Sequence, residues 1–234
     1  MRNKKFIFVT GPSESGKSGG INYIADSYPD DIKHLKIRNI FPEVYKDSNS
    51  DLEFQEWYDT EYENNFEQLW DKYIEKADEM SGDKKIVIMD TMYGVKTIKY
   101  LFSKLKEDLG VLYIDANFNN RVLREFQRLR TDSTRGTRKA DLSITIEQVI
   151  EKTKKKDESK RKKETFEYKS LVYSPDSEDI LVGNREISIP FSYVINNDGS
   201  LEEFHEALDE FAVKEIGKRK NSNGVVKKYT PRNN

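Results

Sequence analysis

The sequence predicts an α/β fold, a three-layer α/β/α sandwich around a five-stranded parallel sheet. Apolar runs of strand length alternate with helical patterns along the chain, a glycine-rich loop follows the first run, and 234 residues suffice for one such domain. We expect a single domain over residues 1–217 and a polar, disordered tail over residues 218–234.

The first apolar run, residues 6–10, leads into a phosphate-loop motif. Helical spacing follows the motif in residues 21–28, and Pro29 ends that helix. Backbone N–H groups and the helix dipole of such a loop bind phosphates, its lysine reaches the β- and γ-phosphates, and its last hydroxyl binds Mg²⁺. The sequence therefore predicts a nucleoside triphosphate site in the segment that matches G-x-x-x-x-G-K-[ST]: Gly11-Pro12-Ser13-Glu14-Ser15-Gly16-Lys17-Ser18.

Two features of this loop are unusual. Glu14 places a carboxylate where glycine or a basic residue is common, and the simplest interpretation is that its side chain points to solvent. Gly19 and Gly20 weaken the start of the helix, each by up to about 1 kcal/mol relative to alanine. They indicate close packing against the sheet or the ligand.

The next segments predict a strand, a helical region and a second strand. Residues 36–40 alternate like a strand that Phe41-Pro42 ends, and residues 52–80 form one long or broken amphipathic helix whose aromatic side chains belong to the core. Residues 86–89 predict a central strand that ends at Asp90. Ligands of open α/β sheets bind at this edge, so Asp90 is expected to hold Mg²⁺ or to accept a proton from an attacking hydroxyl. The alternative is an exposed aspartate in a turn.

The second half of the chain predicts two further strands and an arginine-rich lid. Residues 111–115 and 191–195 are the strands, and Ser200 with Glu203 forms a capping box for the last helix. The lid covers about residues 130–165, and near its start it is polar, rich in arginine and contains one glycine. Its basic run, residues 154–163, is interpreted as a solvated helix that adds one or two cations, with nucleic-acid binding as the alternative. Residues 169–190 predict a hairpin or a flexible insertion.

Composition limits the class of protein. The 40 basic and 42 acidic residues give a net charge of −2, without the basic excess of a DNA-coating protein. Cysteine is absent, which excludes disulfides and fits a cytoplasmic protein, and His34 and His205 lack metal-ligand spacing. No segment has the apolar length of a membrane span, and the N-terminus leads directly into the first strand without room for a signal peptide. We therefore predict no membrane partner, and the pattern indicates no particular oligomeric state.

Two stretches resemble P-loop nucleoside monophosphate kinases and dephospho-coenzyme A kinases. Residues 111–128 resemble the fourth strand and arginine-bearing helix of these enzymes, and residues 193–204 resemble their closing strand, turn and helix. The resemblance covers most of residues 5–216. It implies the P-loop nucleoside triphosphate hydrolase fold of the nucleotide-kinase type with a helical lid, the use of ATP and Mg²⁺, and an acceptor-binding helical region at about residues 41–82.

The resemblance also implies roles for individual residues. Lys17 would stabilise the transferring phosphoryl group, and Asp90 would orient the acceptor or, with Ser18, hold the metal. Lys156-Asp157 resembles an Arg-Asp pair that follows the lid in some relatives. The remaining expected site residues are Arg124, Arg128 and Arg135 as phosphate or lid ligands, and Arg38, Tyr93 and Arg138 at the acceptor.

The sequence favours ATP-dependent phosphorylation of a nucleotide, with a (deoxy)nucleoside monophosphate as the small-molecule acceptor. Two departures from the family concern that acceptor: residues 90–93 lack an arginine that several relatives have, and residues 169–190 have no counterpart. A first alternative is a kinase for dephospho-coenzyme A or for a hydroxyl within DNA, with DNA less favoured. A second is a nucleotide-dependent switch or regulatory NTPase that transfers nothing to an acceptor.

Overall fold

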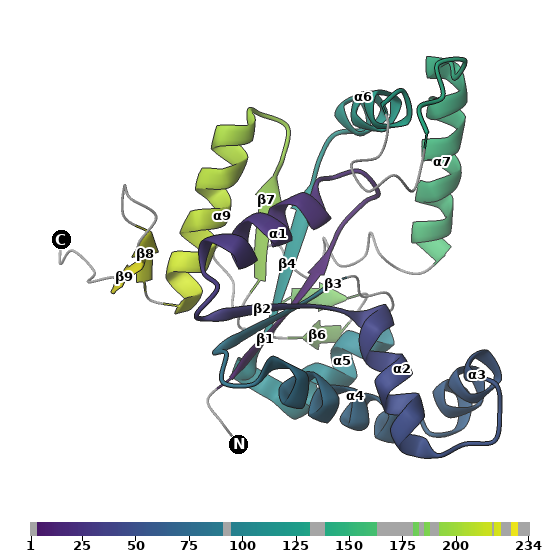
Figure 1. Ribbon diagram of the computed structural model, residues 1–234, viewed down its shortest axis with the longest axis vertical. Helices are drawn as coiled ribbons and strands as arrows, with labels where there is room; N and C mark the ends of the chain where they lie inside the picture. The colour runs from purple at the N-terminus through teal and green to yellow at the C-terminus, as the bar shows by residue number, and fades with distance from the viewer. Residues whose placement is uncertain are drawn as a thin grey trace.

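Five parallel strands form one central sheet in the computed structural model, which describes residues 4–90, 95–131, 139–162, 180–182, 185–187, 192–216, 218–220 and 226–228. The order across the sheet is β2-β3-β1-β4-β7 (Figure 1). The strands are β1 (Lys5–Thr10), β2 (Ile32–Lys36), β3 (Ile86–Asp90), β4 (Leu109–Asp115) and β7 (Ser192–Asn196). Because all five run the same way, their carboxyl ends share one edge, where an α/β sheet binds its ligand.

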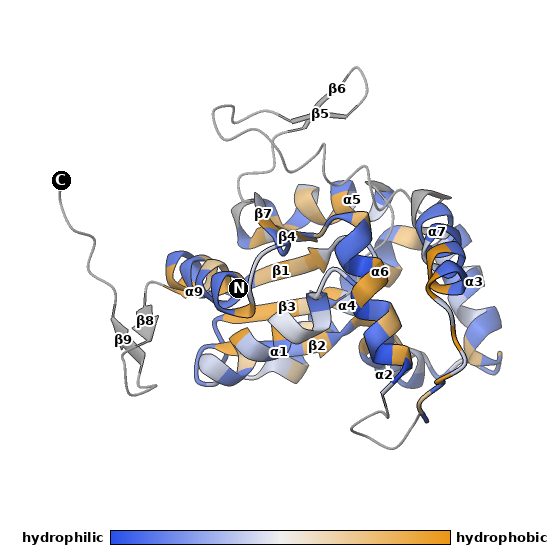
Figure 2. Cartoon of the chain, turned by 90° about the horizontal axis from the view of Figure 1, so that it is seen from above, coloured by the Kyte–Doolittle hydropathy of each residue, from blue (hydrophilic) through white to orange (hydrophobic). Residues whose placement is uncertain are grey.

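Helices cover both faces of the sheet. Alternate residues of β1 point to opposite faces: Ile7 and Val9 pack with α1 (Lys17–Ser27) and α9 (Leu201–Ile216), whereas Phe6 and Phe8 pack with α4 (Phe66–Ser81) and α5 (Val95–Leu105). In Figure 2 the strands are largely orange, and the helices around them carry blue on their outer sides. The predicted three-layer α/β/α sandwich with a five-stranded parallel sheet is therefore confirmed.

The predicted strand at residues 36–40 is wrong. The strand β2 ends at Lys36, and the helix α2 (Ile37–Ser48) begins at the next residue and contains Pro42. The signal for this helix is the spacing of Ile37, Ile40, Phe41 and Val44, which places them on one helical face, and the last three are buried. The free energy gained by burying that face exceeds the free energy lost because proline cannot donate a backbone hydrogen bond.

The helical region predicted at residues 52–80 is broken into two helices. These are α3 (Phe54–Asn64) and α4, which is separated from α3 only by Asn65. Their aromatic side chains pack on one another and on α2: the rings of Phe41 and Trp70 lie 5.3 Å apart, edge to face. The aromatic residues therefore build a core, as the helical spacing predicts.

Helices α6 (Phe118–Leu129) and α7 (Ile146–Lys162) form a separate layer at the carboxyl edge of the sheet (Figure 1). Their contact has its own small apolar cluster around Val122, Leu129 and Val149. The 3₁₀ turn η1 (Lys106–Asp108) joins α5 to β4. Since α6 follows β4 directly, this pair of helices stands beside the phosphate loop.

The described part of the chain has two short antiparallel strand pairs outside the central sheet. The antiparallel pair β5 (Ile180–Val182) and β6 (Arg185–Ile187) lies in the predicted insertion. A second pair, β8 (Lys218–Lys220) and β9 (Val226–Lys228), lies in the segment predicted to be disordered. None of the described helices is both long enough and apolar enough to span a membrane.

Candidate active site

The phosphate loop lies between β1 and α1, and two of its positions require glycine. Gly11 has a φ of 135°, and a Cβ there would lie 2.2 Å from the backbone oxygen of Ile114 in β4. Gly16 has a φ of 96°, and a Cβ would lie 2.3 Å from Nδ2 of Asn197. The loop backbone thus approaches its neighbours more closely than a side chain would allow, which explains why glycine occupies both positions.

The helix that follows the loop packs tightly against α9 through Gly20. A Cβ at Gly20 would lie 2.8 Å from Cζ of Phe204 and 3.1 Å from Cδ1 of Leu208. The expected close packing therefore exists, but its partner is a helix rather than the sheet. A Cβ at Gly19 would have nothing within 4 Å, so packing does not explain glycine there.

Lys17 lies across the loop that precedes it. Its Nζ donates hydrogen bonds to the backbone oxygens of Gly11, at 3.0 Å, and of Pro12, at 2.5 Å. Burial lowers the pKa of Lys17 to about 8, although the negative charges of Glu14 and Asp90 oppose this shift. The ammonium group is thus held at the centre of the loop, within the field of both carboxylates.

Glu14 does not point to solvent, contrary to the simplest interpretation of the sequence. Its carboxylate accepts hydrogen bonds from Nζ of Lys156 at 3.0 Å and from Nη2 of Arg128 at 3.3 Å. Its φ of 61° is left-handed, a conformation that costs a residue other than glycine roughly 1–2 kcal/mol. The loop is therefore tied to α6 and α7 through a strained residue.

Behind Glu14, the fully buried Glu125 of α6 gathers three cations. Its carboxylate accepts hydrogen bonds from Arg128 and, at 3.0 Å, from Lys156. It also forms an ion pair with Lys152 at 3.1 Å. Burial acts to raise the pKa of Glu125, but hydrogen bonds from Arg128, Lys156 and Lys152 outweigh burial and hold the pKa at about 2. Glu125 is therefore ionised at any physiological pH, and Arg128, predicted to bind phosphate, is anchored beside the loop.

The turn after β7 braces the phosphate loop. Asn197 donates from Nδ2 to the backbone oxygen of Ser15 at 2.9 Å, and its own backbone oxygen accepts from Nη2 of Arg124 at 2.7 Å. Nη1 of Arg124 is buried and has no hydrogen-bond partner among the described residues. The predicted arginine thus holds the closing turn with one nitrogen and retains a free donor. The local sequence indicates the turn but not the contact of Asn197 with the loop, because the two lie 182 residues apart.

A buried ion pair that the sequence did not single out joins the loop, α6 and α7. Arg121 donates both terminal nitrogens to Asp157, each at 2.8 Å, and also donates to the backbone oxygens of Ser13 and Ala116. The only signal was the resemblance of Lys156-Asp157 to an Arg-Asp pair. Arg121 is 4% exposed.

Asp90 and Ser18 line one cavity of about 390 Å³ at the carboxyl edge of the sheet. Asp90 is nearly buried, and its Oδ2 lies 3.4 Å from Nε2 of His34 on the neighbouring strand. The rest of the lining comes from the end of β2, α2 and α3: Lys36, Ile37, Arg38, Phe41 and Tyr58. Asp90 is therefore not an exposed turn residue, and it lines the same cavity as Ser18 and Arg38.

The hydroxyl of Ser18 and the carboxylate of Asp90 are oxygen donors, the kind that Mg²⁺ prefers. Among the described residues, no three His, Cys, Asp or Glu side chains gather as an all-protein metal site. Mg²⁺ in phosphoryl-transfer sites uses one or two protein oxygens and completes its shell with water and phosphate. The residues present therefore fit magnesium held together with a nucleotide.

Three predicted site residues, Tyr93, Arg135 and Arg138, lie outside the described residues. In the sequence, Tyr93 comes three residues after the end of β3, and Arg135 and Arg138 belong to the predicted lid. The described part of the lid begins again at residue 139 and includes α7.

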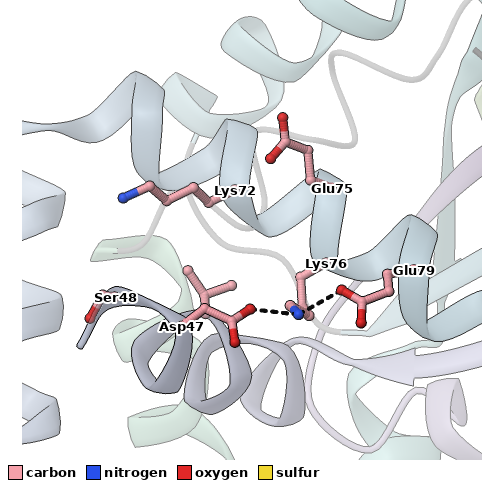
Figure 3. A pocket seen from close by; sticks show the side chains of 7 residues that line it. Asp47, Ser48, Lys72, Glu75, Lys76 and Glu79 are labelled. Atoms are coloured by element: carbon pink, nitrogen blue, oxygen red, sulfur yellow. Dashed lines mark hydrogen bonds and ion pairs between the residues drawn. The ribbon is translucent and has the colours of Figure 1, made fainter. Parts of the chain in front are cut away.

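A second cavity, of about 250 Å³, lies between α2 and α4 and contains no residue of the phosphate loop. Figure 3 shows Lys76 between Asp47 and Glu79. The Nζ of Lys76 lies 2.5 Å from Oδ2 of Asp47 and 2.6 Å from Oε2 of Glu79. The amino group of Lys76 thus pairs with both carboxylates, and this cavity takes no part in the candidate active site.

No family model matches the chain, and no curated protein matches it in sequence. The fold is similar to a sugar kinase from Janibacter sp., with 10% identity over 91% of this chain and 94% of that one and a TM-score of 0.44. A shikimate kinase from Bacteroides thetaiotaomicron has 11% identity, coverage of 88% and 96% and a TM-score of 0.41. A gluconokinase from Sinorhizobium meliloti has 12% identity, coverage of 92% and 97% and a TM-score of 0.41. These values are too low to support an argument about activity, which rests on the site itself.

Proposed function

We propose that this chain is a kinase that transfers a phosphoryl group from ATP to a (deoxy)nucleoside monophosphate. The observation that carries the proposal is the cavity in which the end of the phosphate loop, at Ser18, and the strand-end carboxylate of Asp90 face Lys36 and Arg38. Donor and acceptor groups bound in one cavity would be held close together, and such positioning, with stabilisation of the phosphoryl charge, is what catalyses phosphoryl transfer.

The donor half would bind the triphosphate through the loop backbone and Lys17. The left-handed glycines at both ends of the loop let its backbone curve around an anion, and α1 adds the positive end of its dipole. With a pKa of about 8, Lys17 is mostly protonated at neutral pH. A phosphate beside it raises that pKa again, so the ammonium stays charged while negative charge develops on the phosphoryl oxygens.

Ser18 and Asp90 would hold Mg²⁺ together with the nucleotide. Bound magnesium would neutralise the charge of the phosphate oxygens. Asp90 can also orient the acceptor, since its carboxylate lines the acceptor cavity. The nearby ring of His34 limits the orientations that the carboxylate can adopt.

The acceptor half suits a molecule with one anionic group and a flat ring. Lys36 and Arg38 supply two positive charges, and Phe41 and Tyr58 supply aromatic faces whose ring centres lie 5.0 Å apart. Burial raises the pKa of Tyr58 to about 12, so its hydroxyl remains a neutral donor. A cavity of about 390 Å³ is within the usual range for a small-molecule site of roughly 300–1,000 Å³. These features support a nucleoside monophosphate.

The test is a transfer assay with ATP, Mg²⁺ and separate acceptors: the nucleoside monophosphates, dephospho-coenzyme A, and a DNA oligonucleotide, with products resolved by chromatography. We expect a diphosphate product from at least one monophosphate. Lys17→Ala should lower kcat by about a hundredfold or more, because the phosphoryl charge loses its main cation. Lys72→Ala, which removes an exposed lysine of α4 outside the cavity, is the matched control and should leave kcat unchanged.

Each other outcome assigns a different function. Transfer only to dephospho-coenzyme A or to DNA would replace the acceptor proposed here, and salt-sensitive DNA affinity would accompany the latter. Slow release of phosphate that no acceptor accelerates would indicate the nucleotide-dependent switch. Absence of any product, with the protein folded, would refute the kinase proposal.

A further inference from the structure

Glu14 occupies a backbone conformation that its residue type disfavours. Three described residues other than glycine have a positive φ: Glu14, Asn49 and Lys106. Asn49 ends a helix, where asparagine commonly adopts this conformation, and Lys106 begins the η1 turn. Glu14 alone of the three lies in a candidate binding loop. A strained residue at such a place persists because its surroundings hold it, and its contacts indicate what holds it.

The contacts of Glu14 are cations that come from elsewhere in the chain. Lys156 of α7 is 142 residues away in sequence, and Arg128 of α6 is 114 residues away. Both cations also contact Glu125, whose side chain is fully buried. Glu14 is different, because its side chain is 20% exposed and it lies in the segment that wraps the phosphates. The two cations therefore bridge one fixed carboxylate and one carboxylate on the loop.

Glu14 also acts on the lysine that binds phosphate. Its charge is the largest electrostatic influence on Lys17. One carboxylate thus lies within the field of Lys17, Arg128 and Lys156, the cations that a polyphosphate bound in this loop would attract. A carboxylate and a phosphate competing for the same cations repel each other, and the phosphate, with its greater charge and additional acceptor oxygens, wins.

We propose that Glu14 is an internal counter-ion that the triphosphate displaces from Arg128 and Lys156. This inference rests on the donor site of the proposed function. Displacement would present the two cations of α6 and α7 to the phosphates. Glu14 is thus a positioning residue: it lowers the affinity for ATP, and it prevents mutual repulsion of the cations around the loop. Nucleotide binding is thereby coupled to the position of α7.

The test is titration with a fluorescent N-methylanthraniloyl ATP in the presence of Mg²⁺. Glu14→Gln removes the charge and keeps the shape, and Glu14→Gly removes the charge together with the backbone strain. We expect both variants to bind the probe roughly tenfold more tightly at low salt, with a smaller gain at high salt, because screening weakens interactions between partly exposed charges. Glu151→Gln is the matched control, since Glu151 pairs with the exposed Lys154 on α7 and does not contact the loop.

A second substitution separates displacement from simple repulsion of the probe. Lys156→Met in the Glu14→Gln background should remove most of the gain in affinity, because the freed lysine supplies it. If the wild type binds the probe and both Glu14 variants bind it equally well or more weakly, this inference is overturned and the proposed function still stands. If the double variant keeps the whole gain in probe affinity, Glu14 only repels the probe and Lys156 does not move to the phosphates. That result would overturn the coupling to α7. If the wild type binds no probe, the donor site of the proposed function fails, and the inference with it.

Discussion

Replacement of Asp157 by asparagine tests whether the buried ion pair holds α7 to the phosphate loop. Arg121 is 4% exposed and Asp157 carries a side chain that is 14% exposed, and two parallel hydrogen bonds of 2.8 Å join them. The guanidinium cannot lose its proton in a protein, so the substitution leaves a buried charge without its counter-ion.

The expected loss of stability is large. Removal of one partner from a buried ion pair costs about 3–5 kcal/mol, and we take the lower end, about 3 kcal/mol, because asparagine can still accept one hydrogen bond. For a chain of this size each kcal/mol lowers Tm by about 2–4 °C, so the melting temperature should fall by about 6–12 °C. Since Arg121 also donates to Ser13 of the loop, the affinity for ATP should fall as well.

The measurement is thermal unfolding followed by circular dichroism, with Asp71→Asn as the matched control. Asp71 pairs with Lys104 at 2.9 Å, but both side chains are more than two-fifths exposed. Its substitution should cost no more than about 1 kcal/mol, because solvent screens such pairs. If the two substitutions shift Tm equally, burial does not determine the strength of the Arg121–Asp157 pair and the reasoning is refuted.

Two further predictions concern the loop itself. Gly11→Ala should abolish binding of ATP, measured by fluorescence titration, because its Cβ would lie 2.2 Å from a backbone oxygen. The control is Gly19→Ala, whose Cβ meets nothing within 4 Å; this variant should bind ATP normally and gain up to about 1 kcal/mol of stability. Normal binding of ATP by Gly11→Ala would contradict the geometry. Burial lowers the pKa of Lys17 to about 8, so the free protein loses this positive charge as the pH rises through 8. Above that pH, the Kd for ATP should increase by up to about tenfold for each pH unit. Lys17→Arg should flatten this profile, since arginine stays charged, and an unchanged profile would exclude Lys17 as the titrating group.

Local patterns predicted the elements that local forces determine. A few consecutive residues specify each of three elements: the phosphate loop, the strand that ends at Asp90 and the capping box. In the capping box, the backbone N–H of Ser200 donates to the carboxylate of Glu203 at 2.7 Å, and the backbone N–H of Glu203 donates to the hydroxyl of Ser200 at 3.1 Å. The boundary between β2 and α2 was predicted wrongly because residues 36–40 fit a strand and a helix almost equally over so short a range. The longer spacing to Val44 and its burial decide for the helix.

The sequence by itself determined the alternation of strands and helices outside the boundary of β2 and α2, the glycines of the loop and the chemical types of Lys17, Ser18 and Asp90. Only the tertiary structure decided which charges pair around them. Arg121 and Asp157 are 36 residues apart, and Glu14 is 142 residues from Lys156. Such pairs arise when α6 and α7 pack on each other beside the loop, and a charged residue on a helix gives no local sign of whether packing will bury it against a partner or leave it in water.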